Sequence, residues 1–313
     1  MNILLTGATG FVGTILFQHL QHLSEFELRV ALHTPHPSYH KGIVVGSIDG
    51  QTDWSDALRD MEVVIHLAAY AHVTNRLRLD AAALREINCF GTQNLIRQAI
   101  AAKVKHFIFI SSIGAVTSLS PVVLTENSAC HPTTLYGQSK LKAEQELIKL
   151  SQNTSMTYTI LRPPLIYGPG NPGNMKRLLK LVGSGLPLPF GAVKNRRSLL
   201  YVGNLVDAIA TCITHPNAQN QSFLISDGAD LSTPDLIRQI GQEMGKSPVL
   251  IPFPSKAIRA VARLVGRQDT LERLTGSLAI DSSKIQLTLD WHPPFQPEQG
   301  LRETVAWYLR QSP

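Results

Sequence analysis

The residues with the clearest catalytic potential are a tyrosine and a lysine that stand four positions apart. Tyr136 and Lys140 open a segment with helical periodicity, so they share one face of the expected helix. A tyrosine phenol, with a pKa of about 10, is a poor base at neutral pH, and a neighbouring ammonium group favours its phenolate. Ser112 lies at the end of an apolar segment, at a position where parallel sheets carry their active sites. We predict that Ser112, Tyr136 and Lys140 act together on one substrate oxygen.

Three glycines near the N-terminus form a second motif. A tyrosine four residues before a lysine is also common on ordinary helix surfaces, so the catalytic interpretation of Tyr136 and Lys140 depends on this second motif. Gly7, Gly10 and Gly13 lie between a short apolar strand at 2–5 and a helical segment at 13–23. Glycine permits a tight turn and lets backbone N–H groups approach a pyrophosphate at a helix N-terminus. The pattern predicts a dinucleotide-binding loop, with Gly13 letting the helix lie close to the sheet.

The choice between NAD and NADP depends on the end of the second strand, at 28–32. An acidic residue that binds the ribose hydroxyls is expected about 20 residues beyond the glycines. His33 and Thr34 stand there instead, so no carboxylate would repel a 2′-phosphate. The pattern favours NADP, with NAD as the alternative if His33 is only a surface residue.

The elements that must position these residues alternate in type along the first half of the chain. Strand-like apolar runs are separated by segments with helical spacing, which predicts a parallel sheet covered by helices on both faces. Prolines and glycines become frequent after Arg162. We predict an α/β fold: a Rossmann-like doubly wound parallel sheet with a smaller C-terminal substrate-binding lobe. The expected strands are 2–5, 28–32, 63–67, 106–110 and 158–161, the expected helices are 13–23, 85–102, 138–151 and 298–309, and the expected domains are 1–165, with a return segment near 195–228, and 166–313.

Composition excludes several classes of protein. Of the 313 residues, 43% are hydrophobic and 17% are charged, which rules out a disordered or collagen-like chain. Three widely spaced cysteines give neither a metal-ligand spacing nor an even disulfide set, so we expect no metal site and a reducing, cytoplasmic location. We expect no membrane insertion and no signal peptide, since apolar runs are short and no basic n-region precedes the first glycine. The net charge of +6 forms no basic stripe, which argues against nucleic-acid binding.

Taken together, the motifs resemble those of a known family. The chain is similar to extended short-chain dehydrogenases/reductases of the NAD-dependent epimerase/dehydratase family, which act on nucleotide sugars, and most of all to a bacterial subgroup that works on UDP-N-acetylhexosamines for surface polysaccharide. The resemblance covers nearly the whole chain. It rests on 7–13, His66-Leu67-Ala68-Ala69, 88–92, Ser111-Ser112, Tyr136, Lys140, 162–170 and 200–207.

This resemblance implies roles for further residues. Cofactor contacts are implied for Phe11, Val12, Ile48, Leu67, Ala68, Ala69, Pro163 and Leu165, beside the three glycines, His33, Tyr136 and Lys140. Contacts with a UDP-sugar are implied for Asn174, Leu188, Phe190, Arg197 and Arg273, beside Ser112. From the residues alone, Asn174 could instead be a helix cap and Arg197 a surface cation. Family members often form homodimers through the two helices expected here at 85–102 and 138–151.

Two departures from the family pattern narrow the activity. Family 4,6-dehydratases carry an acidic pair directly after the catalytic hydroxyl residue, but Ile113 and Gly114 stand here, so dehydration is not expected. Ser47 replaces an adenine-contacting aspartate, for which Asp49 could substitute. Two reactions at C4 of a UDP-sugar remain: reduction of a 4-keto-6-deoxy sugar with NAD(P)H, which the missing ribose carboxylate favours, and 4-epimerisation with tightly bound NAD. A cofactor-binding regulatory protein is disfavoured by the intact Ser112, Tyr136 and Lys140 set.

Overall fold

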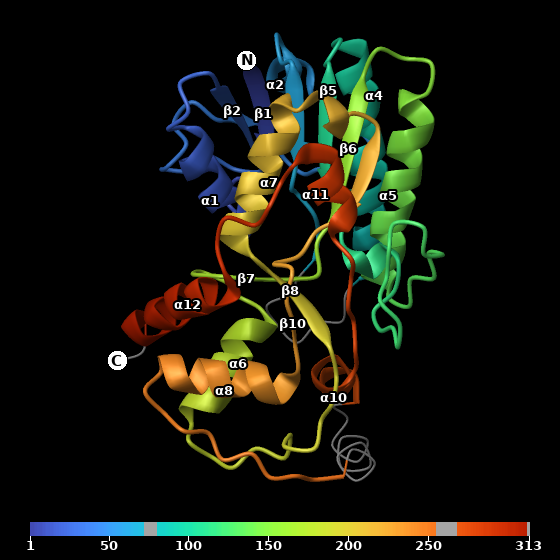
Figure 1. Cartoon of the computed structure of the whole chain (residues 1–313). Helices are drawn as coiled ribbons and strands as arrows, with labels where there is room; N and C mark the ends of the chain where they lie inside the picture. The colour runs from blue at the N-terminus through green and yellow to red at the C-terminus, as the bar shows by residue number, and fades with distance from the viewer. Residues whose placement is uncertain (72–79, 255–267, 312–313) are drawn as a thin grey trace.

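The computed structural model describes residues 1–71, 80–254 and 268–311. Its largest element is a seven-stranded sheet with the strand order β3-β2-β1-β4-β5-β6-β9, in which all neighbours run parallel (Figure 1). Its strands are β1 (Asn2–Thr6), β2 (Glu27–Leu32), β3 (Ile43–Val44), β4 (Val63–His66), β5 (His106–Ile110), β6 (Thr157–Arg162) and β9 (Gln221–Leu224).

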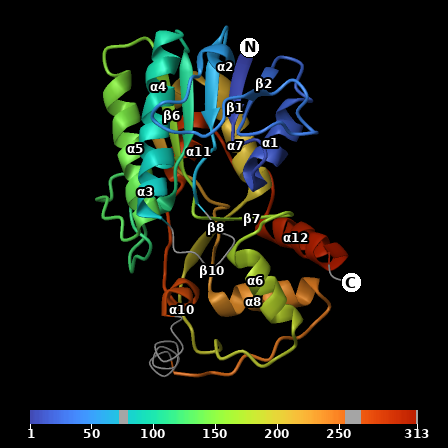
Figure 2. The same ribbon diagram turned by 180° about the vertical axis from the view of Figure 1, so that it is seen from behind.

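Alternate side chains of these strands enter two different cores, because successive residues of a strand point to opposite faces. On β1, Leu5 packs with helices α1 (Phe11–Leu20), α7 (Val202–Thr214) and α11 (Ser283–Leu289). Leu4 faces the opposite core, which holds α2 (Ser55–Leu58), α4 (Thr92–Ala101) and α5 (Leu135–Ser151). Figures 1 and 2 show these two helical layers on either side of the sheet. The predicted doubly wound α/β fold is confirmed.

A smaller lobe lies beyond the carboxyl ends of the strands (Figure 2). It has its own core and a three-stranded sheet in the order β10-β8-β7. Its strands are β7 (Leu165–Tyr167), β8 (Arg197–Tyr201) and β10 (Asp230–Leu231), and its helices are α6 (Asn174–Gly183), α8 (Thr233–Glu243), α10 (Gln268–Thr275) and α12 (Pro297–Gln311).

The chain returns from this lobe to the main sheet. β9 pairs with β6, α7 packs over the face that carries α1, and α11 packs there as well. The domain boundary predicted between residues 165 and 166 falls inside β7.

Most of the expected elements lie within three residues of their predicted ends. The segment expected as one helix at 85–102 instead consists of two consecutive pieces, which a short helix precedes. α3 (Ala81–Ala83) leads into a π-helix, η1 (Leu84–Gly91), which continues as α4. Short 3₁₀ turns, η2 (Ile113–Ala115) and η3 (Pro216–Ala218), follow β5 and α7. Among the described residues, no helix is long and apolar enough to cross a bilayer.

Candidate active site

The glycine loop lies where β1 and β4 are adjacent, which is the point in the strand order where connections diverge and where open α/β sheets bind ligands. Gly7 has a φ of +75°, which favours glycine, and a Cβ there would lie 2.7 Å from the backbone nitrogen of Ala68. A Cβ on Gly13 would lie 2.1 Å from the carbonyl oxygen of Gly7. The loop, the start of α1 and the segment after β4 therefore meet at van der Waals distance.

This cradle fits the pyrophosphate of a dinucleotide. Gly10 is the N-cap residue of α1, and no described side chain caps that helix. The first N–H groups of α1 are thus left for an anion, as at other helix N-termini that bind phosphate. Phe11 and Val12 stand in this first turn, and Phe11 reaches the loop after β7, near Gly168 and Gly170. The residues present are those that NAD or NADP would need at this end of the sheet.

The other predicted cofactor residues surround the same edge. Leu67, Ala68 and Ala69 follow β4 directly and are partly buried. The segment is anchored by Thr6, whose Oγ1 accepts from the Ala68 N–H at 3.3 Å and hydrogen-bonds Nδ1 of His66 at 2.7 Å. Three other residues predicted to contact the cofactor lie in or after other strands: Pro163 after β6, Leu165 in β7 and Ile48 after β3.

His33 is the first residue after β2, and its side chain is exposed. It therefore stands at the strand end where a ribose-binding carboxylate was expected and not found. Ile48 packs against the helical segment on the other side, since a Cβ on Gly91 would lie 2.7 Å from its Cγ2.

Lys140 is buried beneath the site, and its ammonium group is aimed at the end of β5. Its Nζ donates to the carbonyl oxygen of Ile110 at 2.8 Å and lies 4.5 Å from the ring centroid of Phe109. Burial lowers the pKa of Lys140 to about 8, and Glu144, one turn further along α5, opposes that shift. The cation is thereby held two residues from Ser112.

Tyr136 and Ser112 stand on separate segments that pack together near this end of the sheet. Tyr136 stands in the first turn of α5, which Thr134 caps by accepting the Gly137 N–H at 3.1 Å. Burial raises the pKa of Tyr136 to about 12, so without a nearby cation the residue is a proton donor. Ser112 follows β5 as the N-cap residue of η2, and its Oγ accepts from the Gly114 N–H at 3.0 Å. The three predicted catalytic residues are thus arranged around the carboxyl end of β5.

Two buried interactions that the sequence analysis did not find support this arrangement. Glu144 on α5 accepts two hydrogen bonds from Arg162 at the end of β6, at 3.0 and 2.6 Å. Asn88 in η1 binds the backbone of Tyr70 through both of its side-chain atoms and donates to Ser139 Oγ at 3.0 Å. A buried asparagine on the apolar face of a helix was the available signal for the second interaction.

Arg197 and Arg273 are two cations of the lobe whose charges interact. Arg197 begins β8, is partly buried, and donates to the carbonyl oxygen of Gly276 at 3.1 Å. Burial lowers the pKa of Arg197, and the charge of Arg273 lowers it further. Two guanidinium groups that repel each other would be stabilised by a bound diphosphate.

The remaining predicted substrate residues lie at different depths. Asn174 is exposed and is the first residue of α6, whose N-cap residue is Gly173, so Asn174 is not the helix cap. Leu188 and Phe190 have side chains buried in the lobe core. The Leu188 backbone donates to the Val249 carbonyl oxygen and accepts from the Ile251 N–H, both at 2.9 Å.

Comparisons with known proteins identify the family of this chain. The model of the NAD dependent epimerase/dehydratase family matches residues 3–226. A UDP-glucose 4-epimerase of Vibrio cholerae is 41% identical over 315 residues, which cover 99% of this chain and 96% of the relative. An N-acetyl-alpha-D-glucosaminyl-diphospho-ditrans,octacis-undecaprenol 4-epimerase of Escherichia coli O157:H7 is 27% identical, over 98% of this chain and 95% of the relative.

Solved structures show the same fold. A UDP-glucuronic acid 4-epimerase from Bacillus cereus in complex with NAD has a TM-score of 0.81 at 22% identity, covering 100% of both chains. A UDP-glucose 4-epimerase with UDP-glucose from Thermotoga maritima has a TM-score of 0.78 at 24% identity, covering 99% of both chains. The resemblance drawn from the motifs is confirmed: this chain belongs to the NAD dependent epimerase/dehydratase family of enzymes.

Proposed function

We propose that this enzyme is a 4-epimerase of UDP-hexoses or UDP-N-acetylhexosamines that retains NAD. The observation that carries the proposal is the 41% identity to a UDP-glucose 4-epimerase over almost the whole of both chains. The sequence alone favoured a 4-ketoreductase over a 4-epimerase, because the ribose carboxylate is missing. The proposal now places the epimerase first. Incubation with UDP-glucose and UDP-GlcNAc in turn, without added cofactor, tests it through appearance of the C4 epimer by NMR.

The residues of the site divide the work between proton transfer and orientation. When bound, the nicotinamide supplies the acceptor and later the donor of the C4 hydride. Tyr136 takes the proton of the C4 hydroxyl and returns it, and Ser112 hydrogen-bonds the same oxygen. Burial raises the pKa of Tyr136, and the Lys140 ammonium group, held by the Ile110 carbonyl one helical turn away, is the positive charge that would favour its phenolate during the reaction.

Dehydration is not part of the proposal, because the segment after Ser112 holds no acid. Ile113 is buried and Gly114 has no side chain. Elimination of water across C5 and C6 needs a general acid and a general base at that place, and η2 offers neither.

A 4-ketoreductase that uses NADPH is the second candidate, and the exposed His33 at the end of β2 is the observation in its favour. A reductase must exchange its cofactor after each turnover, whereas an epimerase keeps it. The position of His33 is compatible with a 2′-phosphate and does not exclude NAD.

The variant His33→Asp tests the cofactor preference. A carboxylate at the end of β2 would bind ribose hydroxyls and repel a 2′-phosphate. We expect the variant to lose NADPH affinity by about tenfold or more, equivalent to about 1.4 kcal/mol, while its NADH affinity holds or rises. Fluorescence titration of both nucleotides measures this, with Thr34→Ser as a control for the loop. Equal affinities in wild type and variant for NADPH would place His33 outside the ribose site.

Arg197 is proposed to bind the diphosphate of the UDP-sugar. Arg197→Ala should weaken UDP binding by about 1.5–3 kcal/mol, the usual contribution of a charge-assisted hydrogen bond, and leave NAD affinity unchanged. Calorimetric titration of UDP and of NAD into both proteins measures the two affinities. Arg196→Ala is the matched control, since Arg196 is paired with Asp230 at 2.9 Å. If UDP bound Arg197→Ala as tightly as wild type, the diphosphate site would lie elsewhere.

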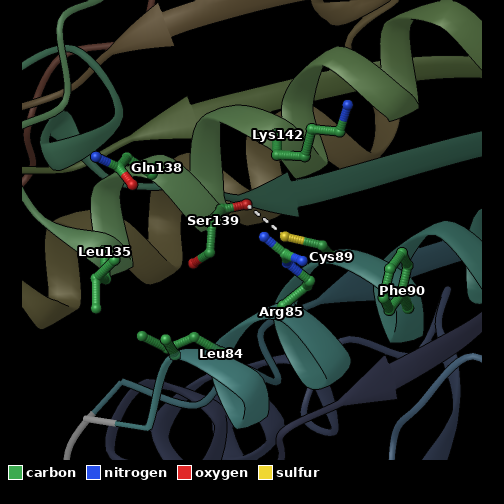
Figure 3. A pocket seen from close by; sticks show the side chains of 9 residues that line it. Leu84, Arg85, Cys89, Phe90, Leu135, Gln138, Ser139 and Lys142 are labelled. Carbon is green, nitrogen blue, oxygen red and sulfur yellow. Dashed lines mark hydrogen bonds between the residues drawn. The ribbon is translucent and has the colours of Figure 1, made fainter. Parts of the chain in front are cut away.

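We also propose a homodimer formed through η1, α4 and α5. A pocket with a volume of about 390 Å³ lies on this face. Figure 3 shows the residues that line it, which come from η1 and α5 together with Ala81 of α3. Its lining includes Phe90, which is 46% exposed, and Leu135, which is 50% exposed. Large apolar side chains on one face are typical of subunit contacts.

We propose a cytoplasmic location as well. The three cysteines are unpaired, which fits a reducing compartment.

A further inference from the structure

Ser112 and Tyr136 belong to separate segments, so something must fix the distance between their hydroxyl groups. Ser112 is held at the start of η2, and Tyr136 in the first turn of α5. These two short pieces pack directly against each other. The contact is made by one glycine from each: Gly114 of η2 and Gly137 of α5.

The two backbones approach more closely than any side chain would allow. A Cβ on Gly137 would lie 2.1 Å from the carbonyl oxygen of Gly114 and 2.9 Å from its carbonyl carbon. Both atoms belong to a backbone, so the clash could not be relieved by rotating a side chain. Alanine at 137 would therefore push η2 and α5 apart.

Each glycine is also linked to one of the two catalytic residues, Gly114 to Ser112 and Gly137 to Tyr136. The Gly114 N–H donates to Ser112 Oγ at 3.0 Å, so η2 cannot shift without disturbing that hydroxyl. Gly137 directly follows Tyr136, and its N–H donates to the capping Oγ1 of Thr134 at 3.1 Å. The line of contacts runs from the Ser112 hydroxyl through Gly114 to Gly137 and the Tyr136 backbone.

We propose that Gly114 and Gly137 are a positioning pair that sets the Ser112 hydroxyl against the Tyr136 phenol. The pair acts by placing Ser112, since glycine has no side chain with which to take part in the chemistry. This inference rests on the roles proposed above for Ser112 and Tyr136. It explains why a glycine, one of the weakest helix formers, occupies the first turn of the catalytic helix.

A double-mutant cycle tests the proposal with purified full-length enzyme and UDP-glucose or UDP-GlcNAc, whichever wild type turns over. Gly137→Ala should lower kcat at least tenfold, with KM and the affinities for UDP and NAD within twofold of wild type. In a Ser112→Ala background, the same change should lower kcat by less than twofold, because the hydroxyl that it misplaces is already absent. Gly183→Ala is the control, since a Cβ there would meet only side-chain atoms at 3.9 Å; it should behave as wild type.

Several outcomes would overturn the inference. An equal fold loss from Gly137→Ala in both backgrounds would mean that the effect does not pass through Ser112, and unchanged kcat would mean that the contact positions nothing. If Gly137→Ala fails to fold, Gly114→Ala decides: its Cβ would lie 3.2 Å from Ser112 Oγ without touching the α5 backbone closer than 3.9 Å. A wild-type kcat in that variant contradicts the proposal. Absence of turnover by wild type itself would contradict the proposed function first, and this inference with it.

Discussion

Replacing Tyr136 with phenylalanine should reduce turnover by about 10²–10⁴-fold, the usual contribution of a positioned general acid–base. The ring would stay in place in the first turn of α5, so UDP and NAD affinities should remain near wild type. The expected loss follows from the proposed role of the phenol, because phenylalanine keeps the ring but has no proton to donate or accept.

Steady-state kinetics with a UDP-hexose measure this loss. Tyr158→Phe is the matched control, because Tyr158 lies near the start of β6, away from the carboxyl end of β5, and should leave turnover unchanged. Turnover by Tyr136→Phe within a few fold of wild type would remove the phenol from the mechanism.

Acid should destabilise the fold through two buried histidines. His66 bonds Thr6 and Thr92, and burial lowers its pKa to about 3; His106 bonds two threonines, and burial lowers its pKa to about 4. Unfolded histidine has a pKa near 6.5, so below that pH the unfolded state binds protons that the folded state excludes. Stability is therefore full above about pH 6.5 and falls as pH drops towards the folded values. Between pH 7 and 5 we expect a loss of about 2 kcal/mol per histidine.

Urea unfolding at pH 7 and 5 measures the free energy of unfolding. His106→Gln should remove about half of the pH-dependent loss, because one titrating group is gone. His22→Gln, at an exposed position, should leave the loss unchanged. The same pH dependence in wild type and His106→Gln would show that buried histidines do not control acid stability.

The sequence was sufficient for those parts of the fold that depend on local periodicity and on glycine. β5 has the predicted bounds, and the loop at Gly7 and Gly13 lies against Ala68 as a close backbone approach requires. The π-helix at Leu84–Gly91 was not predicted, since its apolar spacing is nearly that of an α-helix. Its register depends on tertiary bonds from Asn88 to Tyr70 and Ser139, which no local pattern encodes.

The candidate site likewise combines features that follow from local sequence patterns with features that depend on tertiary packing. Tyr136 and Lys140 could be placed on one helix face from their spacing, but the bond from Lys140 to the Ile110 carbonyl depends on how α5 docks on the sheet. The Gly114–Gly137 contact likewise joins segments that are distant in sequence, and glycine at either position has many ordinary explanations. The burial of Leu188 and Phe190 reflects the packing of the lobe, which the family motif did not reveal.

The most direct test of the central claim follows the hydrogen on C4. The enzyme, without added cofactor, is incubated with a UDP-hexose carrying deuterium at C4, and the product is analysed by NMR and mass spectrometry. A 4-epimerase that retains its nicotinamide returns the same hydrogen to C4, so we expect the C4 epimer with its deuterium intact. Absence of the epimer, together with NADPH-dependent reduction of a 4-keto UDP-sugar, would contradict the account and establish the reductase instead.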